Sequence, residues 1–241
     1  MAAKSSIEWT ESTWNPITGC TRISTGCINC YAERMAKRLK AMGQPNYING
    51  FNVTMHNHVL DTPLHWKKPQ TIFVNSMSDL FHEDVPKDFI LKIFDVLNNA
   101  YWHRFQILTK RSNRLAAISY KLSWTSNIWM GVTVENADCK YRIDDLRNSG
   151  AYIKFLSMEP LLSSVGDIDL ENIDWVIVGG ESGPKARPIK IGWVRDIKIQ
   201  CKASNTPFFF KQWGGIRKKK NGRILDGKLW DEFPVKASSG A

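Results

Sequence analysis

Six short apolar runs recur along this chain, and polar residues follow each of them directly. The runs are nearly continuous in apolar and β-branched residues, as is typical of parallel strands buried on both faces. They are Thr71 to Asn75, Arg104 to Leu108, Ile128 to Val134, Tyr152 to Leu156, Asp174 to Val178 and Pro207 to Phe210. A further strand at Ser6 to Thr10 would bring the number to seven.

Segments with a helical pattern lie between these runs. They are Lys87 to Ala100, Ser112 to Lys121, Ala137 to Asn148 and Ile191 to Ala203. The first places five apolar side chains on one face, namely Phe89, Ile90, Ile93, Phe94 and Leu97. Strands that alternate with helices are the order of a parallel α/β sheet, so we predict an α/β fold.

Length and charge favour a single domain with an anionic partner. One domain, 1–241, is expected, with an inserted lobe at about 43–70, where no repeat pattern is visible. The net charge is +10, and residues 211–241 hold eight basic and three acidic residues, which indicates a basic C-terminal extension. Within it, Arg217 to Lys220 followed by Asn-Gly predicts a hairpin turn. Nucleic acid is the expected partner, although a solvated basic tail has the same pattern.

The sequence also favours a cytoplasmic location. No window reaches the roughly 18 apolar residues of a membrane span. The N-terminus lacks the apolar core of a secretory signal. We therefore expect a reducing compartment, in which clustered thiols are more often metal ligands or redox groups than disulfides.

The polar clusters at the strand ends predict where ligands bind. They are NSMSD at 75–79, TKR at 109–111, EN at 135–136, SMEP at 157–160, GGESG at 179–183 and KQWGG at 211–215. The carboxyl ends of parallel strands meet at one rim, where α/β proteins bind their ligands.

Three of the five cysteines lie in one short segment. Cys20, Cys27 and Cys30 have the spacing C-x6-C-x2-C, and neighbouring glycines allow the backbone to approach a metal closely. Thiolates select zinc, copper(I) or iron–sulfur clusters.

Two interpretations of this segment stay open. A structural zinc site needs a fourth ligand, for which the candidates are His56, His58, His65, Cys139 and Cys201. A [4Fe–4S] cluster held by three cysteines would leave one iron open to a small molecule.

Several motifs resemble a known family. WNPITGCTRISTGCINCYAER, SMSDLFH, LTKR, GVTVEN, SMEPLL, VGGESG and FFFKQWGG look like those of a phage and bacterial three-cysteine-motif family, a domain of unknown function. That family is grouped with the radical S-adenosylmethionine (SAM) superfamily and is distantly similar to spore photoproduct lyase, a DNA repair enzyme. The resemblance covers roughly residues 5 to 235 and implies an incomplete (β/α) barrel with about six or seven parallel strands. The superfamily's common spacing is C-x3-C-x2-C, and Asn29 stands where an aromatic residue is usual.

The resemblance implies two cofactors, a [4Fe–4S] cluster on Cys20, Cys27 and Cys30, and SAM on the open iron. An electron from an external donor would cleave SAM and give a 5′-deoxyadenosyl radical that abstracts hydrogen from the substrate. The implied substrate is a nucleic acid or a nucleotide-derived molecule, which the enzyme would repair or modify.

The expected SAM ligands are polar residues at the strand ends and one tyrosine. They are Ser76, Ser78 and Asp79 for the amino group, Thr133 and Glu135 for the ribose, Lys110 for the carboxylate or a substrate phosphate, Ser157, Glu159 and Glu181 for further polar contacts, and Tyr31 for the adenine. The cationic groups Lys110, Arg111 and Lys211 are also suited to structural ion pairs with Glu135, Glu159 or Glu181.

Two other functions fit the same sequence. One is a zinc-stabilised nucleic-acid-binding protein without redox chemistry. The other is a barrel without a cluster that serves as a phage interaction protein. Iron content after anaerobic purification separates both from the radical SAM enzyme.

Overall fold

The computed structural model describes residues 3–5 and 7–234. Its strands are β1 (Ala3–Lys4), β2 (Ser12–Trp14), β3 (Ile17–Thr18), β4 (Thr54–Met55), β5 (Thr71–Val74), β6 (Arg104–Thr109), β7 (Ile128–Thr133), β8 (Ile153–Met158), β9 (Trp175–Gly179) and β10 (Phe208–Gln212). Its α-helices are α1 (Tyr31–Ala41), α2 (Lys87–Asn99), α3 (Ser112–Ile118), α4 (Tyr141–Arg147), α5 (Ile191–Ala203) and α6 (Lys218–Asn221). Each of the six predicted apolar strands is present.

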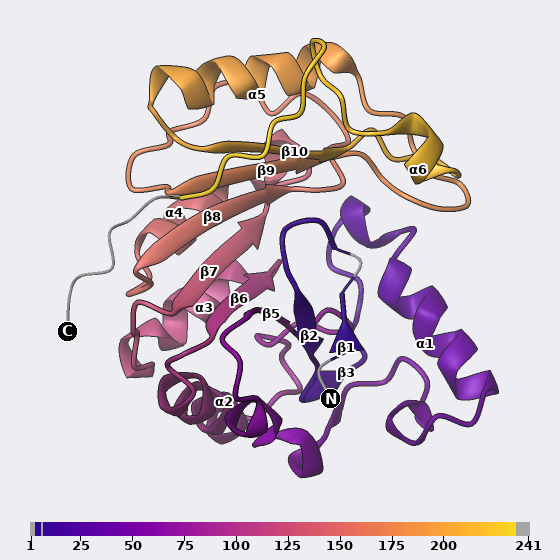
Figure 1. The fold of residues 1–241 in the computed structure, drawn as a ribbon, viewed down its shortest axis with the longest axis vertical. Coiled ribbons are helices and arrows are strands. Elements are labelled where there is room, and N and C mark those ends of the chain that lie inside the picture. Colours follow the sequence, from indigo (N-terminus) through magenta and orange to yellow (C-terminus); the bar gives the residue numbers. More distant parts are fainter. Residues whose placement is uncertain (1–2, 6, 235–241) are drawn as a thin grey trace.

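The main sheet has the strand order β1-β2-β5-β6-β7-β8-β9-β10. All neighbours are parallel except β1 and β2, which are antiparallel. The seven parallel strands curl into a half-barrel (Figure 1). The prediction of an incomplete (β/α) barrel with six or seven parallel strands is confirmed.

The two faces of the sheet bury different side chains. Residues that alternate along the strands point to opposite faces, so one set packs under the helices and the other fills the concave side. The helical side includes the apolar face predicted for α2, whose Ile90 and Ile93 are fully buried. The concave side is filled by a mostly aromatic cluster of Trp9, Trp129, Ile153, Phe155, Trp175, Ile177 and Phe209. Open space for a ligand is therefore confined to the ends of the half-barrel.

The strand predicted at Ser6 to Thr10 is wrong. Ser6 lies outside the described residues, Glu8 and Trp9 form a turn, and the first parallel strand is β2. The turn carries the indole of Trp9 into the concave cluster, where its ring centroid lies 4.9 Å from that of Phe73. Burial of this large side chain outweighs the strand propensity of the segment.

The hairpin predicted at Arg217 to Lys220 is also wrong, because these residues lead into the short helix α6. Lysine and arginine are good helix formers. The helical turn closes at Gly222, whose φ of 68° is left-handed and whose amide donates to the Lys218 carbonyl at 3.1 Å.

Two further segments lie outside the parallel strands and the helices that cover them. Residues 43–70 contain β4, which pairs with β3 immediately before the first clustered cysteine. Residues 223–234 return along β10, where the Phe210 amide donates to the Trp230 carbonyl at 2.9 Å. The expected C-terminal extension reaches residue 241, and 235–241 lie outside the described residues. No helix in the described part of the chain is long and apolar enough to span a membrane.

Candidate functional site

The cysteine loop (residues 19–30) lies at the carboxyl ends of the parallel strands, between β3 and α1. Cys20, Cys27 and Cys30 all line one pocket of about 300 Å³. The other lining residues come mainly from α1 and the strand ends: Gly26, Tyr31, Ala32, Phe51, Phe73, Asn75, Ser76, Ser78, Asp79, Leu108, Thr109, Lys110, Arg111, Thr133 and Glu159. Thiols and polar groups that are far apart in the sequence therefore share one cavity.

The loop begins at a close contact between backbones. Gly19 has a φ of 85°, and its amide donates to the Met77 carbonyl at 3.1 Å. A Cβ atom at this position would lie 2.2 Å from the Asn52 carbonyl oxygen. Only glycine fits both the left-handed backbone and this close approach.

Gly19→Ala is expected to lower the free energy of unfolding by about 2 to 4 kcal/mol, because it combines left-handed strain with a backbone clash. Urea denaturation measures the loss. Gly43→Ala is the matched control, since Gly43 has a φ of 68° but a Cβ atom there would have no neighbouring atom within 4 Å. We expect it to cost about 1 kcal/mol. Equal losses in the two variants would contradict the role of the close approach.

Asp79 is buried and satisfied within the chain. Its Oδ1 accepts from Thr109 Oγ1 at 2.7 Å and from the Phe81 amide at 3.0 Å. Its Oδ2 accepts from the Lys110 amide at 3.1 Å and from Arg111 Nη1 at 3.3 Å. Four donors fill the usual acceptor positions of a carboxylate, so Asp79 holds the turn that follows β6.

Arg111 connects that turn to the first cysteine. Its Nη2 donates to the carbonyl and hydroxyl oxygens of Thr21 at 3.2 and 2.9 Å, and its Nη1 lies 3.4 Å from Cys20 Sγ. Burial, with a contribution from Asp79, raises the pKa of the Cys20 thiol to about 12 despite the arginine. Without a metal, Cys20 is therefore a neutral thiol at neutral pH.

Glu135 is fully buried behind the second cysteine. Ser24 Oγ donates to its Oε1, and Arg142 Nη1 donates to its Oε2 at 2.8 Å. Burial raises the pKa of Glu135, but the charge of Lys110, the Ser24 bond and Arg142 outweigh burial and lower the pKa. Ser24 Oγ in turn lies 3.7 Å from Cys27 Sγ.

Glu181 lies beside the third cysteine. Its Oε2 accepts from Asn29 Nδ2 and from Arg187 Nε, each at 2.9 Å. Burial raises the pKa of Glu181, but the hydrogen bonds from Arg187 and Asn29 outweigh it and lower the pKa. Arg187 Nη1 also donates to the Thr25 carbonyl at 3.0 Å, so this ion pair contacts the cysteine loop at two points.

The remaining rim residues belong to β8 and β10. Lys211 Nζ donates to both carboxylate oxygens of Glu159, at 2.7 and 2.8 Å. Ser157 is buried in β8 opposite Thr133 and does not line the pocket.

Three polar groups of the pocket lack a partner among the described residues. Buried Thr133 Oγ1 and Asn75 Nδ2 accept and donate no hydrogen bond. The Lys110 ammonium has neither a hydrogen bond nor an ion pair with a described residue, although its charge lowers the pKa values of Cys27 and Glu135. A hydroxyl, an amide donor and a cation beside three thiols fit an iron–sulfur cluster with SAM, which carries hydroxyls, an amine and a carboxylate.

The grouping of possible metal ligands bears on whether the three cysteines fit a zinc site or a [4Fe–4S] cluster. Among residues 3–5 and 7–234, no three side chains of His, Cys, Asp or Glu are grouped to hold one metal ion. A cluster does not need such convergence, because each cysteine binds its own iron. None of the five candidates for a fourth zinc ligand lines the pocket, and Cys139 and Cys201 are buried in the core.

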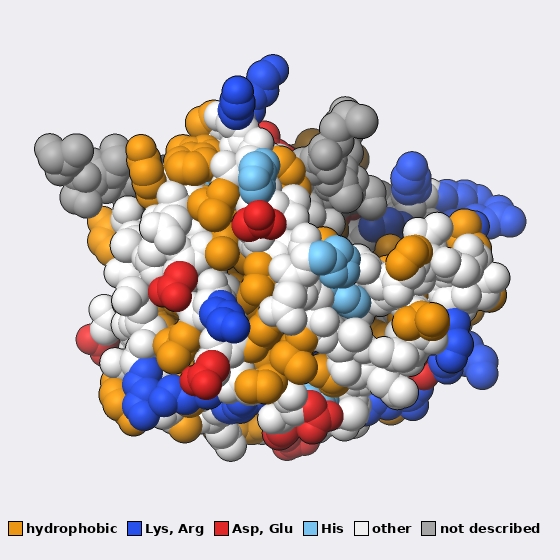
Figure 2. Space-filling model, turned by 90° about the horizontal axis from the view of Figure 1, so that it is seen from below, with side chains coloured by type: hydrophobic (Ala, Val, Ile, Leu, Met, Phe, Trp, Pro, Cys, Tyr) orange, Lys and Arg blue, Asp and Glu red, His pale blue; other side chains and the backbone are white. Residues whose placement is uncertain are grey.

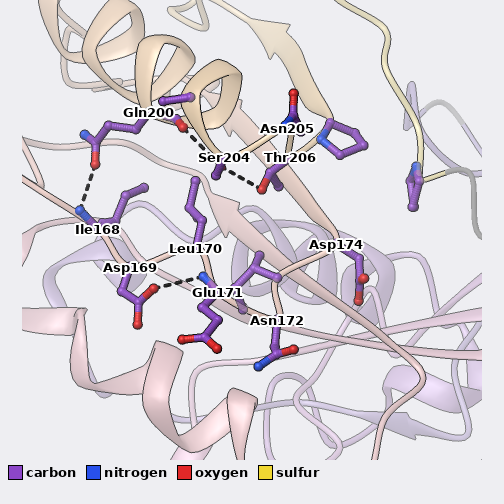
Figure 3. A pocket seen from close by; sticks show the side chains of 14 residues that line it. Ile168, Asp169, Leu170, Glu171, Asn172, Asp174, Gln200, Ser204, Asn205 and Thr206 are labelled. Carbon is purple, nitrogen blue, oxygen red and sulfur yellow. Dashed lines mark hydrogen bonds between the residues drawn. The ribbon is translucent and has the colours of Figure 1, made fainter.

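A larger pocket of about 880 Å³ lies elsewhere (Figure 3). Apart from Pro234, its lining residues precede β9 and β10, so it lies at the amino ends of the strands. Ligands of parallel α/β proteins bind at the carboxyl ends, and the larger pocket holds no cysteine. The smaller pocket with the three thiols is therefore the better candidate.

Most of the expected SAM ligands lie together. Ser76, Ser78, Asp79, Lys110, Thr133, Glu159 and Tyr31 line the pocket, whereas Glu135, Ser157 and Glu181 do not. Sequence reasoning missed the ion-pair partners Arg142 and Arg187, for which no sequence signal exists. It also missed Asn75, which opens the NSMSD cluster and has a φ of 60°.

A family model matches nearly the whole chain, at residues 4–234, and is described as a protein of unknown function (DUF5131). The chain belongs to the DUF5131 family. No curated protein sequence matches it.

Solved structures of spore photoproduct lyase have a similar fold to this DUF5131 chain. The lyase complexed with dinucleoside spore photoproduct matches with a TM-score of 0.50 and 10% identity, covering 83% of this chain and 63% of that chain. A lyase variant with dinucleoside spore photoproduct matches with a TM-score of 0.52, 10% identity and the same coverage. This chain thus spans less than two thirds of those structures. At 10% sequence identity this likeness shows a shared fold and no more. The fold is the incomplete barrel that the sequence motifs imply.

Proposed function

We propose that this DUF5131 protein is a radical SAM enzyme that acts on a nucleic acid or a nucleotide-derived substrate. One observation carries the proposal: Cys20, Cys27 and Cys30 share a pocket with Thr133 Oγ1, Asn75 Nδ2 and the Lys110 ammonium, none of which has a partner among the described residues. Thiols for a [4Fe–4S] cluster and polar groups for an amino acid and a ribose are thus adjacent. When bound, the cluster would supply the electron, received from an external donor, that cleaves a carbon–sulfur bond of SAM.

The residues of the pocket would bind and orient SAM. The Lys110 ammonium is suited to its carboxylate, and Thr133 Oγ1 to a ribose hydroxyl. Ser76 and Ser78 offer hydroxyls that now bond to Asn15 Oδ1 at 3.1 Å and to the Ile17 carbonyl at 2.9 Å. Tyr31, exposed at the start of α1, offers an aromatic face for the adenine.

Exposed positive charge on α1, whose first residue lines the pocket, supports an anionic substrate. Arg38 and Lys40 on α1 are exposed and have no ion pair with a described residue. Figure 2 shows Lys and Arg side chains along the edge on the side where α1 lies in Figure 1, and a further group at the opposite lower edge. The structurally similar lyase binds a dinucleoside, which supports a substrate that contains nucleoside units. Cations around a pocket of this kind attract phosphodiester backbones.

SAM binding to the anaerobically reconstituted protein tests the proposal. We expect the wild-type protein to bind SAM, and Thr133→Val to bind it about 5- to 10-fold more weakly, because one hydrogen bond is lost without a change in shape. Equilibrium dialysis with labelled SAM measures both affinities. An iron-loaded wild-type protein that binds no SAM would overturn the proposal.

Thr206→Val is the matched control. Thr206 is also a buried threonine, but it lies before β10, at the opposite end of the half-barrel. We expect SAM affinity to be unchanged in this variant. An unchanged affinity in Thr133→Val would remove the role assigned to its hydroxyl.

A further inference from the structure

Three buried carboxylates lie at the carboxyl ends of alternate strands, and each is paired with an arginine. Asp79 follows β5 and pairs with Arg111. Glu135 follows β7 and pairs with Arg142. Glu181 follows β9 and pairs with Arg187. The side chains of the three carboxylates are at most 8% exposed.

Each pair contacts a different part of the cysteine loop. The Asp79–Arg111 pair contacts Thr21 and Cys20 through the arginine. The second reaches Ser24 through Glu135, and a Cβ on Gly26 would lie 2.7 Å from the same carboxylate oxygen.

The third pair reaches the last part of the loop. Glu181 accepts from Asn29, the residue before Cys30, and Arg187 donates to the carbonyl of Thr25. Contacts therefore fall beside each of the three cysteines.

These contacts matter because the loop has little regular structure of its own. Its described secondary structure is the 3₁₀ turn Thr25–Cys27, in which the Cys27 amide donates to the Ser24 carbonyl at 3.0 Å. Ordering a free loop costs about 1 to 2 kcal/mol for each residue, so thiols on an untethered loop would lose much binding free energy when a cluster forms.

Buried carboxylates are costly unless charge and hydrogen bonds satisfy them. Here the satisfying donors include Ser24 and Asn29 of the loop itself. Release of the loop would take from Glu135 Oε1 its Ser24 donor, and it would remove one donor from Glu181, whose other hydrogen bonds come from Arg187. The folded barrel therefore favours the ordered loop even without a bound group.

We propose that the three acid–arginine pairs are positioning residues that order the cysteine loop before a cluster binds, one pair beside each cysteine. This rests on the proposed function, in which the three cysteines hold the cluster. The scaffold then supplies a preorganised set of thiols, and cluster binding does not have to fold the loop.

Hydrogen exchange of the metal-free protein, measured by mass spectrometry, tests this order. We expect the amides of Cys27 and Ile28 to be protected in the wild type, since both donate backbone hydrogen bonds. Glu135→Gln keeps the size of the side chain but removes its charge, and Ser24→Ala removes only the contribution of the loop. Each is expected to speed exchange in residues 22–28 by about tenfold or more.

Asp145→Asn is the control. Asp145 lies on α4, the helix that carries Arg142, and accepts from Ser112 Oγ at 2.6 Å. It contacts no residue of the cysteine loop, so exchange in residues 22–28 should stay at the wild-type rate. Ser24→Ala keeps the test valid if Glu135→Gln fails to fold.

Iron uptake by the same proteins separates the two proposals. An unprotected wild-type loop in a protein that still loads iron would overturn the positioning role, because the cluster would then order the loop itself. The positioning role would be supported if the loop is protected in the wild type, and if Glu135→Gln and Ser24→Ala both lose this protection and load iron more slowly. A protected loop in a wild type that takes up no iron would overturn the proposed function and leave the ordering of the loop intact.

Discussion

Cys27→Ala is expected to abolish iron–sulfur cluster loading, from about four irons per chain in the reconstituted wild type to none. In the proposed function three thiolates would hold the cluster, and two would not retain it. Cys27 is a favourable ligand because its thiol has a lowered pKa. Burial raises that pKa, but the Lys110 charge and hydrogen bonds from the backbone of Ile23 and from Ser24 outweigh it. Iron analysis and the absorption spectrum after anaerobic reconstitution measure the loss, and Cys20→Ala and Cys30→Ala should behave alike.

The two remaining cysteines supply the controls. Cys139 and Cys201 are buried in the core and do not line the pocket, and burial raises the pKa of Cys201 to about 12. Such thiols are inert, so Cys139→Ala and Cys201→Ala should keep the full iron content. Retention of full iron in Cys27→Ala would contradict the cluster assignment.

Removal of the free positive charges around α6 is expected to weaken nucleic-acid binding by about 10- to 100-fold at low salt. Arg217, Lys219 and Lys220 are exposed and have no ion pair with a described residue, whereas Lys218 lies 3.7 Å from Glu8. The triple change to glutamine should also reduce the slope of log affinity against log salt by up to about 3. Fluorescence anisotropy of a labelled oligonucleotide measures both quantities.

The position of α6 at the rim is what makes this test specific. Gly215, just before the helix, bridges to Ser182, whose carbonyl accepts from Arg34 of α1 at 3.2 Å. The matched control replaces three exposed lysines of the helical layer, Lys92, Lys121 and Lys202, and removes the same charge. Equal losses in the two triple variants would mean that only net charge matters and that α6 has no special role.

The fold was predictable because its strands are short, apolar and buried on both faces. β7 shows why, since every residue from Ile128 to Thr133 is buried and the sequence run is continuous. The failure at Ser6 to Thr10 has a tertiary cause. Trp9 leaves the strand pattern because the concave face of the sheet, assembled from strands much later in the chain, offers its indole a buried position.

The site was predictable only in part. Thr133 and Asp79 reach one pocket because parallel strands end at one rim, a regularity that holds for any such sheet. The role of Glu135 depends on a bond to Ser24, which is 111 positions away in the sequence. Its partner Arg142 lies on α4, and no local sequence pattern determines how this helix is rotated about its axis. Carboxylates that touch a ligand and carboxylates that hold a loop therefore look the same in the sequence.

The aromatic side chains that fill the concave face limit the routes by which a substrate could reach the three thiols. Trp175 packs against Trp9, Trp129, Phe155 and Phe209. These side chains fill the half-barrel between the thiols and the amino ends of the strands. In the proposed function, reactant and product would then both pass through the carboxyl-terminal end of the half-barrel, beside exposed Tyr31. A nucleic-acid substrate would therefore have to place one nucleotide in the pocket and release it before the next turnover.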